Sequence, residues 1–388
     1  MTFELLAEDG AARRGRLTTP HGVVETPAFM PVGTQGVVKS LTPRDLREVG
    51  AEILLANTYH LFLRPGAALV RELGGLHRFM GWDGPILTDS GGYQVWSLAA
   101  LRTISEEGVR FRSHLDGGAE HLLTPELAVD VQHQLGADIV HPLDECLPYP
   151  ASRADTEASM QRTLRWARRG RAAHLAGVRP RQACFGIVQG GLYADLRRVA
   201  AEATCAIGFE GYALGGFAVG EPRGLMVDLV AETASALPRS EPRYLMGVGR
   251  PADLVQAVAA GVDLFDCVLP TRHARTGQLF TRRGLVVIKH AAHARDPRPL
   301  DEACPCYTCR HFSRAYLRHL FLARELTVYR LHTLHNLTFY LGLMARMRAA
   351  IAAGAFERVR REILDASAAA DAEAVTVPVD APAEEDLS

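Results

Sequence analysis

ACFGIVQGGLYADLRRVAAEATCAI, residues 183–207, is the stretch that decides the fold. Its first six residues, 183–188, are apolar and rich in strand-forming side chains, and a glutamine and two glycines follow. From residue 192 to 207 apolar side chains return at helical spacing. A buried strand, a glycine-rich turn and an amphipathic helix make one β/α unit of a parallel sheet.

The same unit recurs along the chain. Helical periodicity marks residues 124–135, 154–175 and 251–260 as well, and two of these helical stretches begin with Thr-Pro or a comparable start signal. We predict eight strands, at residues 27–32, 53–56, 85–88, 138–143, 183–188, 211–214, 244–248 and 262–265. Eight units are typical of an α/β protein of the (β/α)8 TIM barrel type. A doubly wound open sheet is the alternative, because strand order cannot be read from one sequence.

Length and composition indicate an ordinary globular protein. The chain has 388 residues, of which 48% are hydrophobic and 22% charged, enough for a large core. Its start has neither a basic leader nor an apolar core with a cleavage site. No apolar run reaches the ~18 residues of a membrane span. We therefore expect a cytoplasmic protein with reduced thiols.

Charge is unevenly distributed, although the net charge is only −1. Residues 272–330 contain twelve Lys or Arg and four Asp or Glu, whereas the chain after residue 361 contains eight acidic residues and no basic one. The basic segment suits a phosphate backbone, and a solvated charged face is the simpler alternative. Residues 367–388 are mostly Ala, Pro and acidic residues, so we predict a disordered acidic tail.

A cysteine cluster indicates a metal site. Cys304, Cys306 and Cys309 are followed 26 residues later by His335, and three thiolates and an imidazole can close a tetrahedral zinc site. Disulfides, an iron–sulfur cluster, or His332 as the fourth ligand are the alternatives. Four protein ligands leave no open position, so we predict one structural Zn²⁺. It would lie in a subdomain at about residues 280–345, inserted after the eighth strand of a single barrel domain that covers residues 1–366.

Polar residues follow the predicted strands. The active site of such a barrel lies at the carboxyl ends of its strands. The residues at these positions are Asn57, Asp89, Asp144, Glu145, Gln189, Gly215, Gly216, Gly247, Gly249 and Asp266.

Asp266 and Asp89 stand out as a catalytic pair. Two carboxylates at one barrel mouth suit a glycosyl-type displacement, in which one attacks the anomeric carbon and the other transfers the proton. The alternative is that each merely caps a turn or a helix.

Other strand-end residues suit a flat heterocycle. Asp144 and Gln189 offer an acceptor and a donor for its edge, Tyr93 or Met246 a stacking face, and Gly216 an unshielded backbone N–H. Ordinary loop glycines are the alternative. The full dinucleotide fingerprint is absent, so we predict no nucleotide cofactor.

With these residues in place, the chain resembles the bacterial tRNA-guanine transglycosylases (queuine tRNA-ribosyltransferases) from about residue 3 to 348. The stretches that carry the resemblance are VETP (24–27), NTYHL (57–61), LTDSGGYQV (87–95), DEC (144–146), GIVQG (186–190), LMGVG (245–249), FDCVLPTR (265–272) and the Cys-x-Cys-x₂-Cys cluster with His335-Asn336.

The resemblance implies a reaction. Asp266 would attack the ribose C1′ of the wobble guanosine in tRNA with a G-U-N anticodon, leaving a covalent ribosyl-enzyme. A 7-aminomethyl-7-deazaguanine would then replace guanine with net retention, in queuosine biosynthesis. Asp89 would act as the general acid/base.

The resemblance also implies a base pocket and a tRNA contact. Asp144, Gln189 and the Gly216 N–H would read the base edge, and the Phe217 carbonyl would accept from the aminomethyl group. The remaining implied residues are Tyr93 and Met246, which would sandwich the ring, and Arg272 and Arg275, which would grip the anticodon loop.

Two further expectations follow from the resemblance. Cys146 and Val219 match the bacterial form, which takes the small deazaguanine. A homodimer is implied by aromatic positions, which are Phe79, Trp82, Phe312, Tyr316 and His319; a plain core cluster is the alternative.

The chain departs from the usual family pattern at several positions. These are His141-Pro142 before Asp144, Gly191 where Ser is common, Phe217 where Leu is common, and Thr276 where Asn is common. Two other classes compete with this one: a metal-dependent barrel hydrolase, and a non-catalytic tRNA-binding partner subunit. The first would place His-x-His after strand one, which ends Phe-Met-Pro-Val-Gly, and the second would lack the nucleophile.

Overall fold

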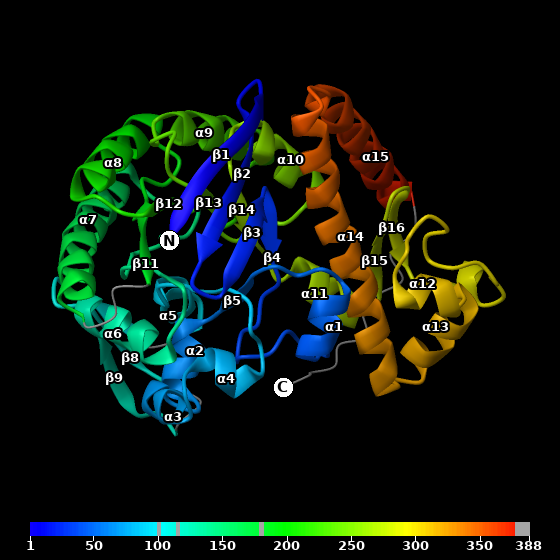
Figure 1. Ribbon diagram of the computed structural model, residues 1–388, viewed down its shortest axis with the longest axis horizontal. Coiled ribbons are helices and arrows are strands. Elements are labelled where there is room, and N and C mark those ends of the chain that lie inside the picture. Colours follow the sequence, from blue (N-terminus) through cyan, green and yellow to red (C-terminus); the bar gives the residue numbers. More distant parts are fainter. Residues whose placement is uncertain (99–101, 114–116, 178–181, 377–388) are drawn as a thin grey trace.

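The centre of the molecule is a parallel, eight-stranded barrel (Figure 1). The computed structural model describes residues 1–98, 102–113, 117–177 and 182–376. Neighbouring strands follow the order β4-β14-β13-β12-β11-β10-β6-β5, and a parallel bridge between Val32 and Leu55 joins the two ends of this sheet. The strands are β4 (Ala28–Met30), β5 (Leu54–Ala56), β6 (Ile86–Thr88), β10 (Ile139–Val140), β11 (Ala183–Val188), β12 (Gly211–Leu214), β13 (Arg243–Leu245) and β14 (Leu264–Asp266).

All eight predicted strands are present, within a few residues of the predicted bounds. The alternative of a doubly wound open sheet is wrong, because the strand order follows the chain around a closed ring. The (β/α)8 barrel is therefore confirmed.

Helices surround the barrel (Figure 1). Two of the predicted helices begin at a side-chain cap: the Thr124 hydroxyl accepts the Leu127 N–H, and the Ser152 hydroxyl accepts the Asp155 N–H. The helices are α1 (Pro43–Glu48), α2 (Thr58–Leu63), α3 (Ala67–Glu72), α4 (Leu76–Met80), α5 (Gly92–Leu98), α6 (Pro125–Leu135), α7 (Arg153–Ala176), α8 (Ala194–Ile207), α9 (Arg223–Ser235) and α10 (Pro251–Ala259).

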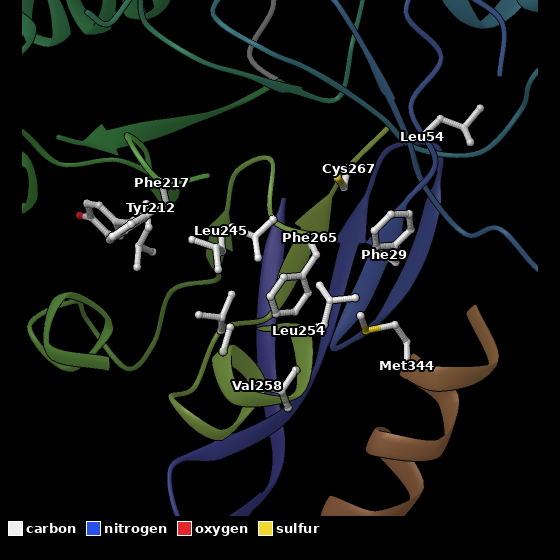
Figure 2. Close-up of a cluster of buried hydrophobic side chains, with 14 of the residues drawn as sticks. Phe29, Leu54, Tyr212, Phe217, Leu245, Leu254, Val258, Phe265, Cys267 and Met344 are labelled. Atoms are coloured by element: carbon white, nitrogen blue, oxygen red, sulfur yellow. The ribbon is translucent and has the colours of Figure 1, made fainter. Parts of the chain in front are cut away.

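The core has two layers, because successive side chains of a strand point to opposite faces. One set fills the barrel interior, as Met30 and Leu264 do. The other set faces the helices: Phe265 packs in one cluster with Leu254 of α10, and Phe29 with Met344 of α14 (Leu326–Ala352) (Figure 2).

A three-stranded antiparallel sheet closes the amino end of the barrel. It consists of β1 (Thr2–Asp9), β2 (Ala12–Thr19) and β3 (Gly22–Thr26). Leu17 and Val24 of this sheet pack with the barrel interior. Arg13 reaches Asp263, directly before β14, and His21 reaches Asp138, directly before β10. The carboxyl ends of the strands stay open to solvent and substrates.

A second antiparallel sheet follows α5. It comprises β7 (Arg102–Ile104), β8 (Val109–Arg112) and β9 (Glu120–Leu123). Phe111 and Leu123 pack with Tyr59 of α2 in a separate cluster beside the barrel. The sequence analysis did not predict this sheet.

The insertion after β14 forms a small unit on the outer side of α14 (Figure 1). Its own buried cluster includes Leu279, Leu300, Leu317 and Leu331. Asn336 of α14 accepts the Phe280 N–H through its Oδ1 and donates to two carbonyls, so the long helix anchors the insertion. The elements are α11 (Leu269–Arg275), β15 (Gln278–Thr281), β16 (Gly284–Val287), η1 (Ala291–His293), α12 (Tyr307–His311), α13 (Arg314–Leu322) and then α14.

The carboxyl-terminal region differs in part from the predicted disordered tail. Helix α15 (Phe356–Thr376) contains the first ten residues of that tail, and its apolar positions Phe356, Val359 and Ile363 pack on the main core. Residues 377–388 lie outside the described residues. None of the described helices is long and apolar enough to cross a membrane.

Candidate active site

A cavity of about 740 Å³ opens at the carboxyl end of the barrel. Residues that follow β5, β6, β10, β11, β12, β13 and β14 line it. The predicted site residues in its wall are Asp89, Tyr93, Asp144, Gln189, Gly216, Phe217, Met246, Asp266 and Arg272. Arg275 is not in the wall; it lies one turn further along α11 and donates to the Thr271 carbonyl over 3.0 Å.

Asp266 is the last residue of β14, and its carboxylate is held through one oxygen. Oδ1 accepts the Tyr244 hydroxyl at 2.6 Å and the Gly247 N–H at 2.8 Å. Among the described residues, nothing donates a hydrogen bond to Oδ2. Burial raises the pKa of Asp266 above its ordinary value. Both donors come from β13 and its loop, so Asp266 does not cap its own turn.

Asp89, directly after β6, is held through both oxygens. Oδ2 accepts the side-chain amides of Asn57 at 2.6 Å and Gln94 at 2.7 Å, and Oδ1 accepts the Thr58 N–H at 2.8 Å. Burial raises the pKa of Asp89 to about 6, and the nearby charge of Asp266 contributes to the rise. The Thr58 N–H opens α2 and Gln94 belongs to α5, so Asp89 joins a neighbouring unit to the helix that follows it. No backbone N–H of the described part of α5 donates to the Asp89 carboxylate.

Asp144 and Gln189 form a polar pair deep in the cavity. Asp144 Oδ2 accepts the Gln189 amide at 2.7 Å, and Oδ1 accepts the Ser90 hydroxyl at 2.6 Å. Burial raises the pKa of Asp144. A Cβ on Gly215 or Gly216 would lie 2.6 Å or 2.5 Å from the Gln189 amide, and Gly216 has a φ of +74°. Both glycines are therefore required for this packing.

Two potential stacking groups and a cation line the cavity. Tyr93 is 47% exposed, and Met246 is half-buried. Arg272, on α11, is exposed. Phe217 is buried, and its ring lies over the guanidinium of Arg197, with the carbon of that group 3.7 Å from the ring centroid.

The groups that hold the carboxylates were not predicted from the sequence. Thr58, Ser90, Gln94 and Tyr244 all donate to one of the three aspartates, as described above. Tyr244 alone left a signal, because it carries a hydroxyl inside the otherwise apolar run of residues 244–248. Thr58 and Ser90 reach their aspartates from other units, so these contacts appear only once the strands are closed into a ring.

The four predicted metal ligands lie together, away from the cavity wall. Their ligand atoms are within 4.8 Å of one another, and the His335 Nδ1 is 3.3 Å from the Cys309 sulfur and 3.7 Å from the Cys306 sulfur. His335 Nε2 lies 2.7 Å from the Phe280 carbonyl, and this contact suits an Nδ1 free to bind a metal. His332 instead faces the Ala274 carbonyl.

The donor set fits the predicted metal. All seven cysteines are free thiols, so the disulfide alternative is wrong. The cluster of Cys304, Cys306, Cys309 and His335 can hold a metal ion, and three sulfurs with one imidazole suit tetrahedral Zn²⁺.

The geometry so far defines a class: a (β/α)8-barrel protein with buried carboxylates at its open end and a separate Cys₃His cluster. Comparison with known proteins is more specific. The family model described as queuine tRNA-ribosyltransferase matches residues 8–369. The chain belongs to this family.

Curated relatives carry the same description. "Queuine tRNA-ribosyltransferase" of Solidesulfovibrio magneticus is 61% identical over 93% of this chain and 96% of its own length. The proteins of that name from Syntrophobacter fumaroxidans and Methylobacillus flagellatus are 58% and 57% identical, each over 93% of this chain and over 96% and 97% of their own lengths. The predicted enzyme class, a tRNA-guanine transglycosylase, is confirmed. These matches favour it over the metal-dependent hydrolase and the non-catalytic subunit.

Proposed function

We propose that the chain exchanges guanine at the wobble position of tRNA with a G-U-N anticodon for 7-aminomethyl-7-deazaguanine. The reaction proceeds by two displacements at the ribose C1′, through a covalent ribosyl-enzyme. The observation that carries this proposal is the pair of buried carboxylates with unlike surroundings. Asp266 has one oxygen without a donor among the described residues, and Asp89 has a pKa of about 6.

In the first displacement Asp266 is the nucleophile. Its Oδ2 forms a bond to C1′ while the C1′–N9 bond breaks, and the electron pair of that bond leaves with guanine. Asp89 gives its proton to the leaving base. A pKa near 6 leaves a useful fraction of Asp89 protonated close to neutral pH.

In the second displacement the roles of the carboxylates reverse. Asp89 removes the N9 proton of the incoming base, N9 attacks C1′, and the ester bond to Asp266 breaks. Two inversions at C1′ give net retention. The Tyr244 hydroxyl and the Gly247 N–H stabilise the carboxylate that is released.

Base selection follows from the polarity of the pocket. The Asp144 carboxylate accepts from the N1–H and the 2-amino group of a guanine-type ring, and Gln189 and the Gly216 N–H donate to O6. An adenine-type edge reverses these polarities and leaves buried groups unpaired. Tyr93 and Met246 sandwich the ring, and the Phe217 carbonyl accepts from the 7-aminomethyl group.

The remaining predicted residues bind the tRNA or support the surface that binds it. Arg272 at the cavity wall and Arg275 on the same helix contact the phosphates of the anticodon loop, supported by the basic segment from residue 272 to 330. One Zn²⁺ in the Cys₃His cluster holds α12 and α14 together and supports this surface without entering the chemistry.

A homodimer in the cytoplasm completes the proposal. Phe79 and Tyr316 are 41% and 45% exposed, which supports an aromatic contact between subunits. Trp82 is 3% exposed and donates to the Pro85 carbonyl, so it acts as a support within the subunit. The seven free thiols agree with a reducing compartment.

The test is exchange of labelled guanine into unmodified tRNA with a G-U-N anticodon. Asp266→Asn abolishes exchange while tRNA affinity stays within a few fold, and Asp228→Asn, on the exposed side of α9, serves as the matched control. A trapped tRNA–protein adduct in the wild type supports the covalent step. Wild-type exchange rates in Asp266→Asn would refute the mechanism.

A further inference from the structure

Arg197, on α8, is a buried cation directly behind the base pocket. It is 1% exposed and is not in the cavity wall. Its Nε donates to the Gly191 carbonyl at 2.6 Å, and one terminal nitrogen, Nη2, donates to the Gly215 carbonyl at 3.0 Å. The other, Nη1, is buried and has no hydrogen-bond partner among the described residues. The ring of Phe217 covers the guanidinium.

No carboxylate lies within salt-bridge distance of Arg197 among the described residues, although the charge of Glu221 acts on it from further away. Burial lowers the pKa of Arg197 to about 9, so the group remains charged at neutral pH. Two carbonyl dipoles and the face of one aromatic ring replace the usual counter-ion. A buried cation held in this way is costly, and the peptide groups that it contacts suggest why it is there.

The Gly215 carbonyl and the Gly216 N–H belong to one peptide group. A cationic donor on the carbonyl oxygen draws electron density through the amide and makes the N–H a stronger donor. We infer that Arg197 is a positioning residue for base recognition: it fixes and polarises the 215–216 peptide, so that the Gly216 N–H binds O6 of the base. This inference rests on the proposed function.

The second hydrogen bond of Arg197 links the inference to Gln189. Gly191 lies in the loop that begins with Gln189, and the neighbouring Gly190 packs so closely on the helix backbone that a Cβ there would lie 2.8 Å from the Arg197 backbone nitrogen. One guanidinium therefore ties the β11 loop to the β12 loop. Both donors to O6, from Gln189 and Gly216, depend on this link.

Phe217 supports the hydrogen bond between Arg197 and Gly215. Its ring lies flat against the guanidinium and shields it from water, which strengthens the hydrogen bond to Gly215. A leucine at this position covers the cation without an aromatic face. The phenylalanine side chain thus stabilises the 215–216 peptide through Arg197.

The test compares two bases in Arg197 variants. In Arg197→Met the KM for guanine rises about tenfold, because a charge-assisted bond is lost, while kcat changes by less than about twofold. Arg197→Lys keeps the charge and recovers part of the loss. With 6-thioguanine, whose sulfur is a weak acceptor, the rise in KM is about threefold or less. A purely structural role raises both KM values equally.

Phe217→Leu provides an independent variant that keeps Arg197. It raises the KM for guanine about threefold, again with a smaller rise for 6-thioguanine. Thermal unfolding identifies variants that fail to fold, and Arg197→Lys and Phe217→Leu decide the matter if Arg197→Met is one of them. Equal penalties for the two bases, or unchanged KM values in folded variants, would overturn the inference. Failure of the wild type to exchange guanine would instead overturn the proposed function.

Discussion

Replacing Tyr244 by Phe tests how the barrel controls Asp266, the proposed nucleophile. The Tyr244 ring is fully buried, and its hydroxyl is one of two donors to Asp266 Oδ1. Phe keeps the ring and leaves no large cavity, so the change removes little except this hydrogen bond. In the proposed mechanism Asp266 must be ionised to attack C1′, and the lost donor stabilised the ionised form. The pKa of Asp266, already raised by burial, is therefore expected to rise further.

The expected size follows from the geometry. The contact is 2.6 Å long and involves a carboxylate, and hydrogen bonds to charged groups contribute about 1.5–3 kcal/mol. One pKa unit corresponds to about 1.4 kcal/mol, so the acid limb of kcat/KM for tRNA moves up by about one to two pH units. Below the limb the variant loses about 10- to 100-fold in rate. Above the limb it approaches the wild type.

The assay is labelled guanine exchange, measured across the pH range in which both proteins stay folded. Tyr212→Phe is the matched control, because Tyr212 lies on the neighbouring strand β12 and packs against Phe209 outside the barrel. Its acid limb should not move. An unshifted limb in Tyr244→Phe, or a rate loss that is equal at every pH, would refute the argument.

Three further outcomes are expected. Gln94→Leu removes a donor to ionised Asp89 and raises the pKa of Asp89 above about 6. The alkaline limb of kcat/KM for tRNA therefore moves up by about one pH unit. An unmoved limb counts against Asp89 as the general acid. Cys306→Ala lowers the zinc content toward zero and the melting temperature with it, whereas one retained zinc per chain would mean that the ion lies elsewhere. Gly92→Ala places a Cβ 2.4 Å from the Asp144 backbone oxygen and 2.9 Å from the Asp144 carboxylate, so that residue must shift and the KM for the base rises roughly tenfold. Gly224→Ala, in open space, should leave the KM unchanged, and equal values in the two variants would contradict the packing.

The barrel could be predicted because its strands are buried on both faces. Parallel strands of this kind are continuous apolar runs, and such runs are conspicuous in a sequence. The antiparallel sheets were not predicted for the opposite reason. In β1 every side chain is exposed or half-buried, so residues 2–9 show little contrast between the two faces. Their pairing is set by contacts with the barrel that no local pattern encodes.

The candidate site, like the fold, could be predicted only in part. Asp89, Asp144, Gln189 and Asp266 could be placed at the cavity because a general rule points to strand ends; their roles stay predictions. Arg197 was not predicted, although it left a signal: it shares the buried face of α8 with Ala200, Ala201 and Thr204, where a cation is unusual. Most partners of the strand-end carboxylates come from other units, and ring closure brings them together; Gln94, which follows Asp89 in the same unit, is the exception.

The hydrogen bonds at the barrel mouth run from each unit to the next. Donors after β5 hold Asp89, a donor after β6 holds Asp144, and the donor after β11 holds Asp144 from the other side. Arg197 then joins the loops of β11 and β12, and β13 holds Asp266. Most donors to each carboxylate therefore come from a neighbouring unit, with Gln94 of α5 as the exception at Asp89. Together with burial, these contacts set the pKa of each carboxyl. It follows that double-mutant cycles between residues that hold the same carboxylate, such as Ser90 and Gln189 on Asp144, should show coupling of about 0.5–3 kcal/mol, whereas Ser90 with Tyr244, which share no partner, should be nearly additive.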